Sequence, residues 1–196
     1  MGQYYKIVNL DKKEYVKDNG FLKLMEWNWI GNTNVSFLFK KLLKDWRNDR
    51  VIIVGDYYDK ETDDYFGFNK KLFLQKTNNT GIYDLGFYDV DELGWTEIDV
   101  DLTDEELSFF EEGYFINETK KIYVDLKKLP INNDEMIVSP TILLACGNGR
   151  GGGDYSESYP DYDKVGTWAG KKISFSTNKP NNDYIEVKYN FIEESD

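Results

Sequence analysis

Apolar and polar positions along the chain divide it into short strands and amphipathic helices. The stretch 4–10 is rich in aromatic and β-branched residues and predicts a strand, and the polar turn after it predicts a return strand that begins at 14–16. The sequence of this hairpin is repeated later in the chain. Residues 116–124 align with residues 8–16 and contain Asn, Lys-Lys and Tyr-Val at the same spacing. We therefore expect two similar hairpins, one from each half of the chain.

Two segments have the periodicity or the end signals of a helix. Apolar residues three and four positions apart from Val35 to Trp46, with lysines on the opposite face, predict an amphipathic helix that packs on a sheet. Asn32 and the two residues after it are candidates for its N-cap. Thr103 and Glu106 form a capping-box pattern, which predicts a short helix that ends by Gly113.

The remaining apolar runs are short and predict further strands. The run 50–56 is continuously apolar at its centre, which predicts a strand buried on both faces. Short polar turns join most neighbours, so the sheet should be mainly antiparallel. The fold class is α+β, a mainly antiparallel β-sheet with two or more short amphipathic helices, in a single domain 1–196. Other expected strands are 71–75, 142–146, 171–176 and 184–191.

Composition excludes several common chemistries. The 196 residues include one cysteine and no histidine, which excludes an intramolecular disulfide, Ser-His-Asp or Cys-His catalysis and the usual zinc ligands. We predict no cofactor and no metal site, and any metal would have to be a hard cation held by oxygen atoms. No apolar run has the length of a membrane span and no signal peptide opens the chain, so we expect a cytoplasmic protein.

The net charge of −12 is concentrated in the middle of the chain. The segment 77–119 contains thirteen acidic residues and no lysine or arginine, whereas the rest of the chain is close to neutral. Such an acidic segment repels nucleic acid, so direct nucleic-acid binding is not expected. It suits either a basic surface on a partner protein or a solvated face without a partner.

A glycine-rich stretch, 147–155, is the most unusual feature of the sequence. It contains five of the sixteen glycines together with Arg150 and Asp154. Its backbone N–H groups could form a concave nest for an anion, to which Arg150 would add donors. The residues after it read as a loop rather than a helix, which excludes a dinucleotide-binding fingerprint. The alternative is a flexible or tightly turned connection without a ligand.

We expect a ligand site where this stretch meets the segment 26–32 and Asp56, which ends the expected strand 50–56. Loops at the ends of strands are where ligand sites on rigid scaffolds tend to lie. Two tryptophans beside a carboxylate at 26–29 could line a pocket or could pack in the core. The candidate ligand-binding residues are Glu26, Trp29, Asn32, Asp56, Asn148, Gly149, Arg150, Gly151, Gly152, Asp154 and Trp168.

Motifs near both ends of the chain resemble one known group of proteins. The segments 1–5, 22–32, 50–56, 147–155 and 165–169 resemble a family of uncharacterised bacterial and phage-associated proteins. The acidic middle segment is not covered by this resemblance. The resemblance implies a bacterial or phage cytoplasmic origin and a shared fold, and it implies no catalytic residue.

Three functions are compatible with these features, and binding is favoured over catalysis. The first is a binding protein that sequesters an anionic small molecule, such as a nucleotide, through the glycine-rich stretch. The second is an acidic module that imitates DNA and occupies a basic surface, as an inhibitor of a host-defence protein. The third is a carboxylate- or metal-dependent hydrolase that uses Glu26, Asp56 and Asp154, although no spacing selects a catalytic pair.

Overall fold

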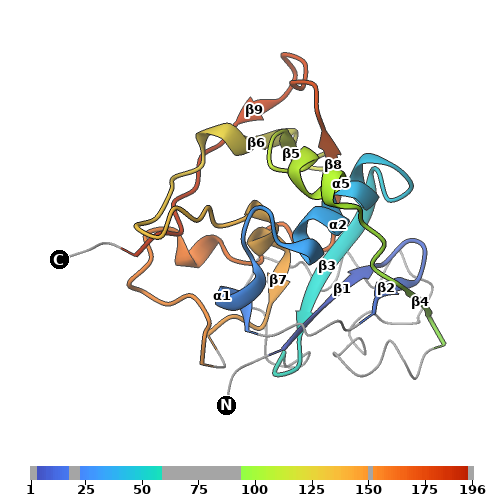
Figure 1. Ribbon diagram of the computed structural model, residues 1–196, viewed down its shortest axis with the longest axis horizontal. Helices are drawn as coiled ribbons and strands as arrows, with labels where there is room; N and C mark the ends of the chain where they lie inside the picture. The colour runs from blue at the N-terminus through green and yellow to red at the C-terminus, as the bar shows by residue number, and fades with distance from the viewer. Residues whose placement is uncertain (1–3, 18–22, 59–93, 150–151, 194–196) are drawn as a thin grey trace.

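One mixed, mostly antiparallel sheet organises the α+β fold (Figure 1). The computed structural model describes residues 4–17, 23–58, 94–149 and 152–193. Within these residues nine strands pair in the order β4-β2-β1-β3-β8-β5-β6-β9, and β7 pairs with β3. The strands are Tyr5–Asn9 (β1), Glu14–Val16 (β2), Asp49–Gly55 (β3), Thr96–Ile98 (β4), Tyr114–Asn117 (β5), Ile122–Asp125 (β6), Ala145–Cys146 (β7), Lys171–Ser176 (β8) and Ile185–Glu186 (β9).

Strand β3 lies in the middle of the sheet and is buried on both faces. Val51 and Ile53 belong to the larger apolar cluster, and Ile52 and Val54 belong to a smaller one. Because side chains alternate along a strand, these two clusters lie on opposite faces of the sheet. Strand β1 pairs along one edge of β3, and β8 and β7 share the other edge. This confirms the prediction that the continuous apolar run 50–56 forms a strand with no solvated face.

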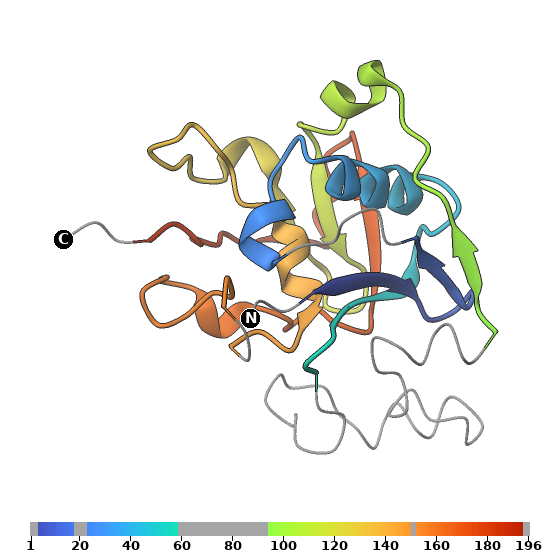
Figure 2. The same ribbon diagram turned by 60° about the horizontal axis from the view of Figure 1, so that its bottom comes forward.

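Among the described residues three α-helices accompany the sheet, and α2 is the longest. The Asn32 side-chain oxygen accepts the N–H of Asn34 (2.9 Å), so the predicted N-cap is present. Figure 2 shows α2 lying against one side of the sheet, with α5 beyond it. The helices are Leu24–Trp27 (α1), Thr33–Leu43 (α2) and Asp104–Phe109 (α5), and three 3₁₀ turns are Leu126–Lys128 (η3), Pro140–Leu144 (η4) and Tyr162–Lys164 (η5).

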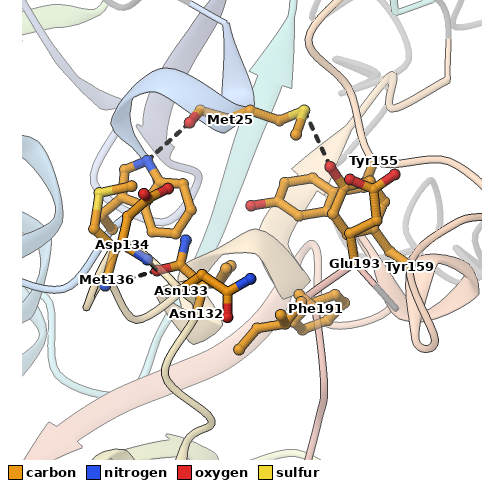
Figure 3. A pocket seen from close by; sticks show the side chains of 12 residues that line it. Met25, Asn132, Asn133, Asp134, Met136, Tyr155, Tyr159, Phe191 and Glu193 are labelled. Atoms are coloured by element: carbon orange, nitrogen blue, oxygen red, sulfur yellow. Dashed lines mark hydrogen bonds between the residues drawn. The ribbon is translucent and has the colours of Figure 1, made fainter. Parts of the chain in front are cut away.

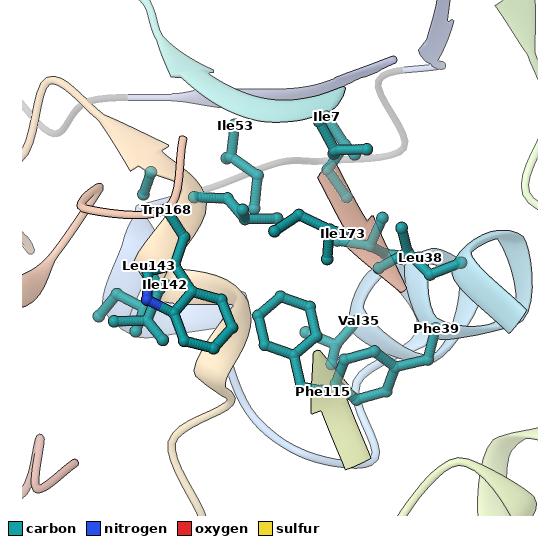
Figure 4. Packing of buried hydrophobic residues seen from close by; sticks show 14 of the residues in the cluster. Ile7, Val35, Leu38, Phe39, Ile53, Phe115, Ile142, Leu143, Trp168 and Ile173 are labelled. Carbon is teal, nitrogen blue, oxygen red and sulfur yellow. The ribbon is translucent and has the colours of Figure 1, made fainter. Parts of the chain in front are cut away.

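Aromatic stacking joins α2 to the second half of the sheet (Figure 4). Phe39 of α2 stacks on Phe175 of β8 with ring centroids 4.6 Å apart. Phe115 of β5 stacks on Trp168 (5.3 Å), which is itself buried. Trp46 is also fully buried. It lies shortly before β3, at the position that Trp168 has relative to β8. Such pairs add to the free energy of burial by about 0.5–1.5 kcal/mol each.

The sheet consists of two halves with the same strand arrangement. From either end, an edge strand is followed by the two strands of a hairpin and then by a central strand. In both halves the edge strand runs parallel to its hairpin neighbour, and the central strand runs antiparallel to the first hairpin strand. Strands β3 and β8 pair antiparallel in the middle. An approximate two-fold axis therefore relates the two halves.

The backbone register obeys this two-fold relation residue by residue. Arg50 of β3 lies opposite Lys172 of β8, at the position of the axis. The N–H of Leu10 donates to the carbonyl of Arg50 (2.9 Å), and the N–H of Glu118 donates to the carbonyl of Lys172 (2.8 Å). Two further equivalent bonds, both 2.9 Å, run from Asn48 to Ile173 and from Gly170 to Val51.

The repeated sequence phrase forms equivalent hairpin turns, as predicted. The buried side chain of Asn9 accepts the N–H of Lys12 (3.0 Å), and the buried side chain of Asn117 accepts the N–H of Lys120 (2.9 Å). Both hairpins are antiparallel and have matching registers. The local repeat was visible in the sequence, whereas the relation between the complete halves was not.

The two-fold relation also extends to one cross-strand side-chain contact. The hydroxyl of Tyr15 donates to Glu97 on the parallel edge strand β4 (3.3 Å). The hydroxyl of Tyr123 donates to Glu186 on the parallel edge strand β9 (3.2 Å). A hydrogen bond from a tyrosine to a glutamate thus joins each edge strand to its hairpin.

The connections that lead into β3 and β8 break the two-fold relation. In the first half α1 and α2 precede β3, whereas η4, β7, the glycine-rich stretch and η5 precede β8. The two connections meet where Trp29 and Val138 form an isolated antiparallel bridge. Beside it, the N–H of Ile30 donates to the carbonyl of Ile137 (2.9 Å). The differences between the halves are therefore gathered at one side of the sheet, around this bridge.

Several element boundaries differ from the predictions. The run 142–146 was expected to be a strand, but η4 occupies most of it because Ser139 caps the turn and Pro140 begins it. Only Ile185–Glu186 of the expected strand 184–191 is a strand. Helix α2 ends at Leu43 rather than Trp46, and α1 and β4 were not predicted. The expected strand 71–75 lies outside the described residues.

Candidate functional site

The described part of the glycine-rich stretch is held by its own side chains. The carboxylate of Asp154 accepts the N–H of Gly149 (3.0 Å). The side-chain amide of Asn148 donates to the carbonyl of Tyr155 and accepts the N–H of Tyr155, both at 2.8 Å. Gly149 has a φ of +89°, a conformation that glycine adopts without strain. The loop is thus closed by two polar side chains.

Two of the predicted carboxylates each accept a hydrogen bond from a residue at the start of β1. The buried hydroxyl of Tyr5 donates to Asp154 (2.9 Å). Asp56, just after β3, accepts the N–H of Tyr4 (3.0 Å). Burial first, and then the negative charge of Asp154, raise the pKa of Tyr5 far above its usual value, with a smaller effect from Asp56. Tyr5 therefore stays neutral and anchors the glycine-rich stretch to the sheet.

Helix α1 packs on the other side of the glycine-rich stretch. The N–H of Met25 donates to the carbonyl of Gly153 (3.1 Å). A side chain at Gly153 would collide with Lys23, because a Cβ there would lie 2.5 Å from the Lys23 side chain. Lys23 in turn pairs with Glu26 (3.7 Å), one of the predicted site residues. Close backbone approach therefore explains this glycine without a ligand.

A cavity of about 410 Å³ opens beside these contacts, and Figure 3 shows its side chains. It lies between α1, the loop before η4, the residues after the glycine-rich stretch and the C-terminal segment. In Figure 1 these segments gather on one side of the sheet. The lining residues are Met25, Trp29, Asn132, Asn133, Asp134, Met136, Val138, Tyr155, Tyr159, Phe191, Ile192 and Glu193.

Tyr155 combines deep burial with an unsatisfied hydroxyl. Its side chain is 1% exposed, and its hydroxyl has no hydrogen-bond partner among the described residues. Its ring packs edge-on against Tyr159 (4.8 Å) and Phe191 (6.0 Å). In Figure 3 the Tyr155 side chain lies at the wall of the cavity, and its hydroxyl has less than 1 Å² of accessible surface. Burial raises the pKa of Tyr155, with a smaller contribution from Tyr159, so the group is a neutral phenol.

Local hydrogen bonds order the two walls of the cavity. The Asn132 side-chain oxygen accepts the N–H groups of Asp134 (3.0 Å) and Met136 (2.8 Å), which fixes this turn. The indole N–H of Trp29 donates to the carbonyl of Met25 (2.8 Å). The Trp29 ring and the turn at Asn132 are thus held in place by hydrogen bonds within the protein, without a ligand.

The structure separates the eleven predicted site residues into several places. Trp29 lines the cavity, whereas Asn32 caps α2 and Trp168 packs in the core. Asp56, Asn148, Gly149 and Asp154 lie around Tyr5 or close the loop, Gly152 is exposed, and Glu26 pairs with Lys23. Arg150 and Gly151 lie outside the described residues.

Most residues of the cavity had no signal in the sequence. Tyr155 is the last residue of the glycine-rich stretch, and Phe191 falls at the end of the expected strand 184–191. The segments that form the cavity are far apart in the chain, and the bridge between Trp29 and Val138 brings two of them together. A pocket built in this way has no local motif.

The described part of the acidic segment is partly neutralised by lysines from elsewhere. Lys17 pairs with Asp99 (3.2 Å), and Lys40 of α2 pairs with Glu106 (3.1 Å). Lys127 pairs with Glu112 (2.6 Å). Residues 77–93 of this segment lie outside the described residues. In the described portion, the negative charge implied by the sequence is therefore partly offset in space.

The described residues contain neither a cluster of metal ligands nor a membrane-spanning helix. No group of three or more His, Cys, Asp or Glu side chains there is placed to hold a metal ion. No described helix is both long and apolar enough to span a membrane.

Aromatic rings and carboxylates define the chemistry of the cavity. Trp29, Tyr155 and Tyr159 supply its aromatic walls, and Asp134 and Glu193 supply its carboxylates. Its chemistry must be inferred from these side chains alone. Comparison of the chain with protein-family models, curated proteins and solved structures found no match.

Proposed function

We propose that this protein is a non-catalytic binding protein whose small-molecule ligand occupies the cavity beside α1. The observation that carries the proposal is the Tyr155 hydroxyl, which is buried at the cavity without a hydrogen-bond partner among the described residues. A buried polar group without a partner costs about 1–3 kcal/mol. The hydroxyl has less than 1 Å² of accessible surface, so a ligand in the cavity would offset that cost only after a neighbouring side chain moves aside.

The composition of the cavity supports a binding role. Ligand pockets are mostly apolar and aromatic, with a few polar groups that orient the ligand. Here Trp29, Phe191 and two tyrosines supply the aromatic surface, and asparagine and carboxylate groups stand at the Asn132 turn. The volume of about 410 Å³ suits a small molecule.

The sequence-based proposal of an anion at the glycine-rich stretch has less support. An anion nest needs free N–H groups that converge on one point. The N–H of Gly149 already donates to Asp154, so this carboxylate occupies the place that an anion would take. Asp154 is further engaged by the Tyr5 hydroxyl. We therefore place the proposed site at the cavity rather than at the loop.

The proposal is tested with one substitution that fills the cavity and one that does not. Met136 lines the cavity, whereas Ile131, in the same loop, does not line it and is 62% exposed. A thermal-shift screen with small metabolites, including nucleotides and methylated amines, should find ligands that stabilise the wild type and Ile131→Trp but not Met136→Trp. At about 100 times the Kd a ligand adds about 2.7 kcal/mol of stability, which is roughly 5–10 °C in Tm for a chain of this size.

Two results would overturn the proposal. One is a wild-type protein whose melting temperature no compound in the screen raises. The other is a ligand that stabilises Met136→Trp as much as the wild type, since that ligand would bind elsewhere. Circular dichroism of Met136→Trp without ligand checks that the variant is folded.

A further inference from the structure

The charge around the cavity has one sign. Asp134 and Glu193 contribute carboxylates, and no lysine or arginine is present among the described residues that line it. Figure 3 shows Asp134 on one side and Glu193 on the other, beside the tyrosines. Burial first, and then the charge of Glu193, raise the pKa of Tyr159. Both carboxylates belong to exposed residues, so the field at the mouth of the cavity attracts a cation and repels an anion.

The apolar surface of the cavity is rich in aromatic rings. Trp29, Tyr155, Tyr159 and Phe191 all line it, and aromatic faces carry partial negative charge. The sulfur of Met25, 4.0 Å from the Tyr159 hydroxyl, adds polarizable surface. A cation near such rings is attracted by their quadrupoles, and this attraction is strongest where water is excluded.

We propose that the cavity binds a small organic cation that carries a methylated ammonium group. This rests on the proposed binding function and specifies its ligand class. The methyl groups would contact the aromatic rings, and the positive charge would face Asp134 and Glu193. A polar substituent such as a hydroxyl would face the side-chain amide of Asn133, an exposed residue that lines the cavity. A compact metal ion is a poorer fit, because it requires several oxygen ligands at one point, and no group of three or more His, Cys, Asp or Glu side chains among the described residues is placed to supply them.

The test compares two ligands of the same shape and different charge. Choline carries a trimethylammonium group, and 3,3-dimethyl-1-butanol replaces its nitrogen with carbon and is neutral. Calorimetric titration of the full-length protein should show that choline binds at least about tenfold more tightly than the neutral analogue. Titration with sodium chloride at the same ionic strength is the blank for the choline titration. Equal binding of the two compounds would overturn the proposal.

Charge-removing variants locate the effect within the cavity. Glu193→Gln and Asp134→Asn keep the size of each side chain, and each should weaken choline binding by roughly five- to tenfold. Glu157→Gln removes the same charge from an exposed residue of the neighbouring loop that does not line the cavity, and it should leave binding unchanged. If all three variants weaken binding equally, the cation responds to the net charge of the protein and the proposed contacts are wrong.

The outcome separates this proposal from the one on which it rests. If choline fails but another metabolite stabilises the wild type and not Met136→Trp, the binding function stands and the cationic ligand class falls. If the compound that stabilises the wild type and not Met136→Trp is a nucleotide, the cavity binds an anion despite its carboxylates, and the cationic ligand class is wrong. If no compound stabilises the protein, both proposals fall.

Discussion

At the scale of single residues, the two halves of the sheet differ in how one buried amide is satisfied. The side-chain amide of Asn9 donates to Asp49 (2.9 Å). The two-fold equivalent of Asp49 is Lys171, which cannot accept, and the amide nitrogen of Asn117 has no partner among the described residues. Burial and the charge of Lys171 together lower the pKa of Lys120. The presence of Asp49 in one half and Lys171 in the other thus changes both the hydrogen bonding of the buried amide and the local charge.

Two buried tyrosines near the glycine-rich stretch should respond oppositely to loss of their hydroxyls. Tyr155→Phe is expected to raise the free energy of unfolding by about 1 kcal/mol, because it removes an unpartnered hydroxyl. Tyr5→Phe is expected to lower it by about 1–3 kcal/mol, because it removes the donor to Asp154. Urea unfolding without ligand measures both. A Tyr155→Phe variant less stable than the wild type would show that the hydroxyl has a partner.

At the scale of elements, α2 contributes to stability through its buried face. Leu42 is fully buried in the larger apolar cluster with Leu38 and Phe39. The same helix presents Lys40 to Glu106 at the start of α5, which joins the two helices on this side of the sheet. Packing of the apolar face, rather than helix propensity, is expected to dominate.

Truncation of this face should be costly. Leu42→Ala is expected to lower the free energy of unfolding by about 2–5 kcal/mol, the range for a buried leucine that leaves a cavity. Lys44→Ala, at the exposed end of the same helix, should change it by less than about 0.5 kcal/mol. Chemical denaturation of both variants makes the comparison. Similar losses for the two would mean that α2 is not packed as described.

Elements with local signals were predictable, and the cavity was not. At α5 the side chain of Thr103 accepts the N–H of Glu106 (3.3 Å) and the Glu106 carboxylate accepts the N–H of Thr103 (3.2 Å), which is the predicted capping box. The 3₁₀ turn η4 was missed because five consecutive apolar residues fit a buried strand as well as a turn. The cavity depends on how distant loops meet, and no spacing along the chain encodes that meeting.

At the scale of the whole molecule, ion pairs redistribute the charge that the sequence concentrates. Lys17 and Lys40 come from the first part of the chain and pair with acids between residues 97 and 106. Exposed pairs of this kind add little stability, about 0–1 kcal/mol. They do reduce the negative field along β4 and α5, so the acidic segment in its described part is a weaker attractant for a basic partner than its composition indicates.

The two-fold relation predicts matched effects at equivalent positions. Tyr15→Phe and Tyr123→Phe each remove a hydroxyl that donates to a glutamate on an edge strand. Each should lower the free energy of unfolding by about 0.5–1.5 kcal/mol. Because four strands separate β2 from β6, the losses should add in the double variant to within about 0.5 kcal/mol. Unequal losses, or strong coupling between them, would show that the two contacts are not equivalent.

The axis through Arg50 and Lys172 has a consequence for how this chain can vary. Two identical subunits around such an axis would form the same sheet, but every substitution in them would appear twice, once on each side. Here both sides belong to one polypeptide, so each position can change alone. The helix α2 on one side and the glycine-rich stretch on the other occupy corresponding connections that have taken different forms. An asymmetric cavity next to a symmetric sheet is an arrangement that a homodimer of half-chains could not build.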